Sequence, residues 1–303
     1  MSDPTPIRRR PSAGALAASA TVLSLLGAHA NAHGIVGNRF FPATLITDDP
    51  AVADELTLPQ IDLLRTADSP PATETDISGE WDKRITQDFG VAFEGEWTDL
   101  KTPVGDVSGF QNFGTTFKYQ AYSNAPHELM ISVGLDIDWG RTGDPHVGAD
   151  STTTLTPNFY FGKGLGDLPD GLAWARPFAI TGVIGYGVPL RGGDSRTLET
   201  GFAFEYSLRY LSSHVKDIGL PSLVNEITPL VELQLSTPVS DGAGAPTTGT
   251  VNPGLIWSGR RFQLGAEAMI PINGASGHAV GAIFQVHWFI DDMFPHSLGR
   301  PIW

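Results

Sequence analysis

Alternation of apolar and polar residues with a period of two is the feature that most constrains how this chain can fold. In the segment 129–139, apolar side chains recur at every second position from Leu129 to Trp139, and Asp136, Asp138 and other mostly small or polar residues occupy the positions between them. Such alternation places the two sets on opposite faces of a β-strand. At about eleven residues, the segment matches a tilted crossing of a bilayer and exceeds the usual strand of a soluble protein.

The same alternation recurs along the chain and predicts about ten strands. They lie at 89–97, 113–121, 129–139, 155–161, 178–188, 202–210, 227–236, 251–257, 262–270 and 280–290. The connections 98–112, 140–150, 189–198 and 238–249 are mostly long and rich in Gly, Pro, Asp and Thr, whereas 123–126 and 258–260 are tight turns. Long outer loops and short periplasmic turns are typical of bacterial outer-membrane barrels.

These patterns predict an all-β fold, namely an antiparallel transmembrane β-barrel of about 10–12 strands over residues 79–291. The expected location is the outer membrane of a Gram-negative bacterium. The alternative is a soluble all-β fold. Acidic side chains on the polar faces favour the barrel, because they need water or partners and a barrel lumen supplies both.

The N-terminal 32 residues predict a secretory signal peptide. Three arginines at positions 8–10 precede an apolar run and two Ala-x-Ala sites. Two cleavage sites are possible. One makes Asn31 the first residue of the mature protein, and the other makes it His33.

Two further segments lie outside the alternating pattern. Residues 33–78 are rich in Pro, Asp and Leu and fit a periplasmic arm, a plug inside the lumen, or an extra hairpin that would raise the strand number to twelve. Residues 292–303 contain Pro295 and Pro301, which disfavour a barrel strand and predict a periplasmic tail.

Composition excludes several functional classes. Removing the signal segment takes three arginines and one aspartate from the 19 basic and 33 acidic residues, which leaves 16 and 32. This acidic balance argues against a nucleic-acid partner, because phosphate neutralisation needs clustered Lys and Arg. The absence of cysteine excludes disulfides, thiolate metal sites and a lipoprotein anchor. No later stretch is apolar for 18 residues, so any crossing of a membrane has to use strands.

Two sets of residues are predicted to carry the properties of the barrel. The polar phase of the strands gives the candidates for the lumen lining, which are Glu94, Glu96, Lys118, Asp136, Asp138, Glu205, Arg209, Glu232, Gln234 and Glu267. Large amphipathic rings near strand ends are the candidates for the membrane interface, and these are Trp97, Trp139, Trp174 and Trp257.

The turn and strand at 123–129, the segment 265–271 and the closing barrel strand carry a resemblance to a known family. Over about residues 75–303 the chain resembles outer-membrane barrels of the phenol-degradation meta-pathway family, which are transporter-like. The resemblance implies an envelope location and passage of small solutes, including hydrophobic or aromatic compounds. None of these segments is a catalytic motif.

The expected function is therefore a passive channel or transporter for small solutes, and its acidic lumen would favour cations or neutral solutes over anions. Its expected partners are outer-membrane lipid and the barrel-assembly machinery. We expect no enzyme, because no Gly-x-Ser-x-Gly elbow is present, and no cofactor. The alternatives are a non-conducting barrel that binds copper through an N-terminal His33 and, less favoured, an outer-membrane hydrolase that uses paired carboxylates such as Asp136 and Asp138.

Overall fold

The computed structural model describes residues 34–67, 70–191, 195–240 and 244–303. The predicted signal peptide, both cleavage sites and the proposed copper ligand His33 lie outside these residues.

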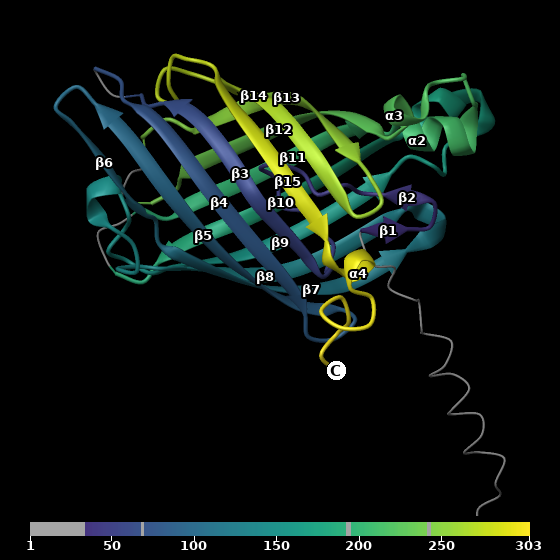
Figure 1. Ribbon diagram of the computed structural model, residues 1–303, viewed down its shortest axis with the longest axis horizontal. Coiled ribbons are helices and arrows are strands. Elements are labelled where there is room, and N and C mark those ends of the chain that lie inside the picture. Colours follow the sequence, from purple (N-terminus) through teal and green to yellow (C-terminus); the bar gives the residue numbers. More distant parts are fainter. Residues whose placement is uncertain (1–33, 68–69, 192–194, 241–243) are drawn as a thin grey trace, which may run out of the picture. The chain divides into compact units, whose positions relative to one another are not determined.

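Twelve antiparallel strands close into a barrel (Figure 1). In chain order the strands of the sheet are β3 (Glu55–Arg65), β4 (Thr73–Arg84), β5 (Phe89–Thr102), β6 (Gly105–Phe110), β7 (Phe113–Asn124), β8 (Leu129–Trp139), β9 (Thr154–Gly164), β10 (Phe178–Pro189), β11 (Thr197–Tyr206), β12 (Ile227–Pro238), β13 (Thr248–Ser258), β14 (Phe262–Pro271) and β15 (Gly281–Phe289). β6 and β7 count as one barrel strand, because both pair with β5, the first along 97–102 and the second along 89–94. The barrel closes where β15 pairs with β3.

Short helices lie in the connections between the strands. Five of them lie in turns at the end where β3 begins and where the C-terminal tail also lies, namely η1 (Ala125–His127), η3 (Asp170–Ala175), α2 (Leu208–Tyr210), η4 (Leu211–Val215) and α3 (Ser222–Asn225). The helix η2 (Pro145–Val147) lies at the opposite end, and α4 (Ile290–Met293) follows the last strand. Bacterial barrels keep their termini in the periplasm, so we call the first end periplasmic and the second outer. Among the described residues, no helix is long and apolar enough to cross a membrane.

The outside of the barrel is apolar. Large hydrophobic side chains on alternate positions of successive strands point outward and remain about two-fifths exposed, among them Phe113, Val133, Phe159, Ile184, Phe204, Val231, Leu255, Leu264, Ile270 and Phe284. A continuous apolar surface on a closed barrel needs lipid around it. The protein is accordingly an outer-membrane β-barrel.

The barrel begins earlier than the sequence pattern predicts, at Glu55 rather than at residue 79. β3 and β4 form the extra hairpin that raises the strand number to twelve. The predicted outer loop 98–112 is likewise mostly strand, because β5 extends to Thr102 and turns back into β6. The last strand ends at Phe289, and the segment after α4 forms turns rather than a strand.

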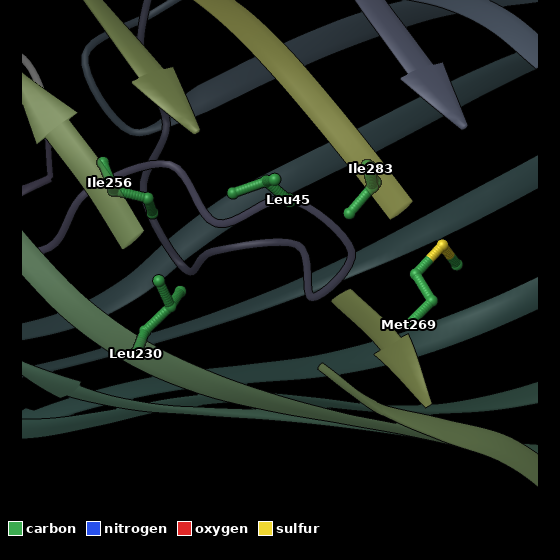
Figure 2. Packing of buried hydrophobic residues seen from close by; sticks show 5 residues of the cluster. All are labelled: Leu45, Leu230, Ile256, Met269 and Ile283. Carbon is green, nitrogen blue, oxygen red and sulfur yellow. The ribbon is translucent and has the colours of Figure 1, made fainter. Parts of the chain in front are cut away.

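Residues 34–54 enter the lumen, and we call them the plug. The plug starts with a small hairpin, β1 (Ile35–Val36) and β2 (Arg39–Phe40). It then forms an irregular loop whose Leu45 packs against Leu230, Ile256, Met269 and Ile283 of the barrel wall (Figure 2). A Cβ added at Gly265 would collide with the Leu45 side chain, so this glycine makes room for the plug. Of the described residues before position 79, 34–54 thus form a plug, and β3 with the first half of β4 forms a hairpin.

Candidate functional site

The tip of the plug is held by one buried carboxylate. Glu232 of β12 is fully buried and accepts hydrogen bonds from the backbone N–H groups of Leu45 (2.6 Å), Ile46 (3.2 Å) and Thr47 (2.5 Å). Three donors converging on one carboxylate give short, charge-assisted hydrogen bonds. Gln263 and Gln285 add side-chain bonds to the carbonyl oxygens of Ala43 and Thr44.

Arg39 anchors the beginning of the plug at the periplasmic end. Its guanidinium is 1% exposed and pairs with Glu128 at 3.2 Å. It also donates to the carbonyl of Pro177 at 2.9 Å and lies 4.0 Å above the ring of Tyr210. Burial, together with the neighbouring Glu128 that accepts its hydrogen bond, raises the pKa of Tyr210 to about 12, so its hydroxyl stays a donor.

Asp54 anchors the end of the plug. It is fully buried and pairs with Lys83 (2.5 Å) and Arg84 (2.7 Å) at the periplasmic end of β4. The same two bases donate to carbonyl oxygens of Leu298, Gly299 and Arg300 in the C-terminal tail. The plug and the tail are therefore fastened to one point of the wall.

A polar cavity of about 660 Å³ runs beside the plug, along the wall formed by β3, β4, β5, β7 and β8. It reaches from Asn112 and Asp150 of the outer connections to Glu55 and Asp82 near the periplasmic end. Eleven carboxylates line it, namely Asp48, Asp49, Glu55, Asp62, Glu80, Asp82, Glu94, Glu96, Asp136, Asp138 and Asp150. We call it the acidic cavity.

Only two basic groups are among the described residues that line the acidic cavity, and both have partners. Lys118 donates to Asp48 (2.6 Å) and to the carbonyl of Asp49 (3.0 Å). His287 contacts Glu55 through Nε2 (3.1 Å) and the Thr57 hydroxyl through Nδ1 (2.9 Å). The lining of the cavity therefore holds many more acidic than basic groups.

The plug contributes a titratable group to this cavity. Burial raises the pKa of Asp49 to about 7, against the opposing effect of Lys118, and the nearby Glu55 and Asp48 add to the increase. Its Oδ1 accepts a hydrogen bond from the N–H of Ala51 at 2.6 Å. Asp49 therefore changes charge near neutral pH.

The structure separates the predicted lumen-lining residues into three groups. Glu94, Glu96, Lys118, Asp136 and Asp138 line the acidic cavity. Glu205, Glu232, Gln234 and Glu267 lie on inward positions of β11, β12 and β14, outside this cavity. Arg209 forms the third group, and its assignment to the lumen lining is wrong. The strand ends at Tyr206, and Ser207 caps a helical turn. Arg209 instead pairs with Glu226 at the surface.

The sequence analysis missed the contacts of the plug and seven of the eleven acidic residues of the cavity. Glu80 and Asp82 lie on β4, and Glu55 and Asp62 on β3, two strands outside the predicted set. The alternation of Gln60 and Asp62 with Ile61 and Leu63 was the available signal.

The predicted interface tryptophans lie at two levels. Trp97 and Trp139 are in the outer halves of β5 and β8, and Trp257 is near the periplasmic end of β13. Trp174 lies in η3, in a turn rather than a strand. Trp81 and Trp288 join the periplasmic level and were not predicted.

A second hollow, of about 450 Å³, is apolar and lies on the lipid-facing side of β3, β13, β14 and β15, where Leu255, Leu264 and Phe284 line it. The acidic cavity differs in that most of its lining is polar. Within the described residues, no cluster of three or more His, Asp or Glu side chains has the geometry of a metal site.

Comparison with solved structures finds other β-barrels. The KdgM porin shares 11% identity at a TM-score of 0.47, covering 77% of this chain and 98% of that one. The β domain of the Bordetella autotransporter BrkA shares 12% identity at 0.42, covering 79% and 99%. OmpF of Salmonella typhi, solved with daunomycin, shares 10% at 0.35, covering 77% and 96%.

No protein-family model and no curated protein matches the sequence. The resemblance to phenol-degradation barrels therefore stays a prediction. At these identities and TM-scores, the similarity to solved structures says nothing about the solute or the activity of this chain.

Proposed function

We propose that this protein is a passive outer-membrane channel that admits small cationic or neutral solutes past a fixed plug. The observation that carries the proposal is the acidic cavity, in which eleven carboxylates face two basic groups that already have partners. A passage with this charge concentrates cations and repels anions.

The cavity favours cations over the hydrophobic or aromatic solutes that the family resemblance implies. Its lining is mostly carboxylate, amide and hydroxyl groups, which an apolar solute would have to desolvate without gaining hydrogen bonds. The apolar hollow on the outside of the wall is in contact with lipid and offers no path along the lumen.

Planar bilayers test this proposal directly. In a gradient of KCl, the purified protein is expected to give conductance steps and a reversal potential that indicates selectivity for K⁺ over Cl⁻. The triple variant Glu80→Gln, Glu94→Gln and Glu96→Gln removes three carboxyl groups from the cavity. Each charge is worth about 0.5 kcal/mol to an ion roughly 8 Å away in water, so the permeability ratio should fall by up to roughly tenfold at low salt.

The control is Glu226→Gln, which removes a carboxylate from the periplasmic surface where it pairs with Arg209. Its selectivity should match that of the wild-type protein. Anion selectivity of the wild-type protein, or a triple variant that keeps the wild-type permeability ratio, would contradict the proposal, as would a complete lack of conductance.

A further inference from the structure

Two buried carboxylates meet beside the tip of the plug without a basic partner. Glu232 of β12 and Glu267 of β14 lie against each other inside the barrel. Glu232 is 0% and Glu267 5% exposed. Among the ion pairs of the described residues, neither Glu232 nor Glu267 has a Lys, Arg or His partner. Both oxygens of Glu267 are buried, and the described residues provide no hydrogen-bond donor to them.

The strand between the two carboxylates brings them together. In the ladder, Glu232 is opposite Asn252 of β13, and Gly254 of β13 is opposite Glu267. A Cβ at Gly254 would collide with the Cγ of Glu267. The Glu267 side chain therefore crosses β13 over this glycine, toward β12 and Glu232.

Asn252 is a second, independent observation at the same place. It is 0% exposed, and neither its carbonyl oxygen nor its amide nitrogen has a hydrogen-bond partner among the described residues. A fully buried amide without partners is destabilising, so a group that binds it is expected. Its inward position opposite Glu232 directs it to the carboxylate pair.

The surroundings make two adjacent negative charges costly. Leu230 and Met269 are two positions from Glu232 and Glu267 along their strands, and Ile283 is opposite Glu267. Together with Ile256 and Leu45 they form the apolar cluster of Figure 2. In such surroundings like charges repel strongly and are retained only with a counter-charge. Either a proton or a cation has to supply that charge.

We infer that Glu232, Glu267, Asn252 and the plug residue Thr47 form a calcium site that ties the plug to the wall. The three N–H groups on Glu232 leave at least one of its four lone-pair positions free. Glu267 offers two oxygens and Asn252 one, and the Thr47 hydroxyl adjoins Glu232. These ligands are all oxygens. Ca²⁺ accepts six to eight oxygens in flexible geometry, whereas Mg²⁺ demands a regular octahedron and dehydrates reluctantly.

The test is calcium binding to the folded, full-length mature protein in detergent after removal of metal with EDTA. Calorimetric titration with CaCl₂ should show one tight site per barrel, and the melting temperature should be higher in Ca²⁺ than in EDTA. Glu267→Gln should weaken binding by roughly tenfold or more, because ligand charge sets calcium affinity. Asn252→Leu, which keeps the volume but removes the carbonyl, should also weaken it.

Glu205→Gln is the matched control, since Glu205 is an equally buried lumen carboxylate that bonds Thr181 on β10. It should keep the tight site. The triple glutamine variant of the acidic cavity should keep it too, which separates this site from weak binding in the cavity and from the proposed selectivity. Absence of tight binding in the wild-type protein, or unchanged binding in Glu267→Gln and Asn252→Leu, would show that a shared proton balances the pair and would overturn the inference.

Discussion

Arg39 is a buried cation whose partners all lie in other parts of the chain. Its contacts with Glu128, Pro177 and Tyr210 fix the first turn of the plug to three periplasmic turns of the barrel. Removing one partner of a buried ion pair leaves the other charge uncompensated, which costs about 3–5 kcal/mol. The plug depends on this residue more than on any surface pair.

Arg39→Ala is therefore expected to release the beginning of the plug. Limited proteolysis of the folded protein in detergent should cut within residues 34–54 far faster than in the wild-type protein. The control is Arg209→Ala, because Arg209 forms an exposed pair with Glu226 that is worth less than about 1 kcal/mol. Equal cleavage rates in the two variants would contradict the anchoring role.

Asp49 predicts a pH dependence of plug docking. Its pKa is about 7 in the docked plug and near 3.8 when exposed, so docking takes up a proton between these values. Asp49 therefore stabilises the docked plug fully below pH 3.8, and this stabilisation is lost as the pH rises through 7. Conductance is expected to be lower at pH 5 than at pH 8.

Asp49→Asn keeps the acceptor for the Ala51 N–H and removes the titration. Because Lys118, Asp48 and Glu55 still face the position, part of the pH dependence can remain. The difference in conductance between pH 5 and pH 8 should become smaller than in the wild-type protein. A difference that is unchanged or larger would exclude Asp49 as the titrating group.

At the scale of elements, the seam between β3 and β15 is an irregular part of the wall. Leu58 and Pro59 of β3 face the single residue Val286 of β15, which forms a bulge, and Pro59 has no N–H to donate. Side chains bridge the gap, since the indole N–H of Trp288 donates to the carbonyl of Leu58 at 3.0 Å and Gln285 donates to Gln60 at 3.2 Å.

Trp288→Phe should weaken this seam, since it keeps an aromatic ring at the membrane interface and removes the hydrogen bond. We expect a loss of about 1 kcal/mol, measured as a lower denaturant midpoint when the barrel unfolds in detergent. Trp257→Phe is the matched control, because the described residues give its indole no hydrogen bond. A midpoint drop in Trp257→Phe as large as in Trp288→Phe would show that the bond does not support the seam.

The same irregularity explains which elements the sequence predicts and which it does not. The strand at 129–139 has an unbroken apolar face and is confirmed as β8. In β3 the bulge at Leu58 and Pro59 shifts the alternation by one residue, and in β4 only Ile77 and Trp81 are large and apolar on the outer face. A period-two search therefore finds β8 and passes over β3 and β4.

The residues of the candidate site divide in the same way into those that local alternation predicts and those that it does not. Inward carboxylates such as Glu94 and Asp136 belong to regular strands, so alternation alone assigns them to the lumen. The plug contacts depend on pairs such as Leu45 and Glu232, which are 187 residues apart. No local pattern encodes a contact over that distance, and the closing of the barrel has to be known first.

For the whole molecule, the plug narrows the passage and leaves the acidic cavity beside it. Deleting residues 34–53 would retain Asp54 and all barrel strands and would empty the space that the plug occupies. The expected result is a several-fold larger single-channel conductance with preserved heat-modifiable migration on gels. Unchanged conductance in a correctly folded deletion variant would show that the plug does not limit passage.

The hydrogen bonds of Glu232 to the plug also set an order of events in assembly. The plug is synthesised before β3, yet it binds β12 and packs against β13, β14 and β15, which are synthesised last. Its tip can dock only after these strands have emerged and the chain has curled back on itself. Docking of the plug therefore requires a finished barrel. Before the barrel is finished, the plug segment is accessible to envelope chaperones and proteases.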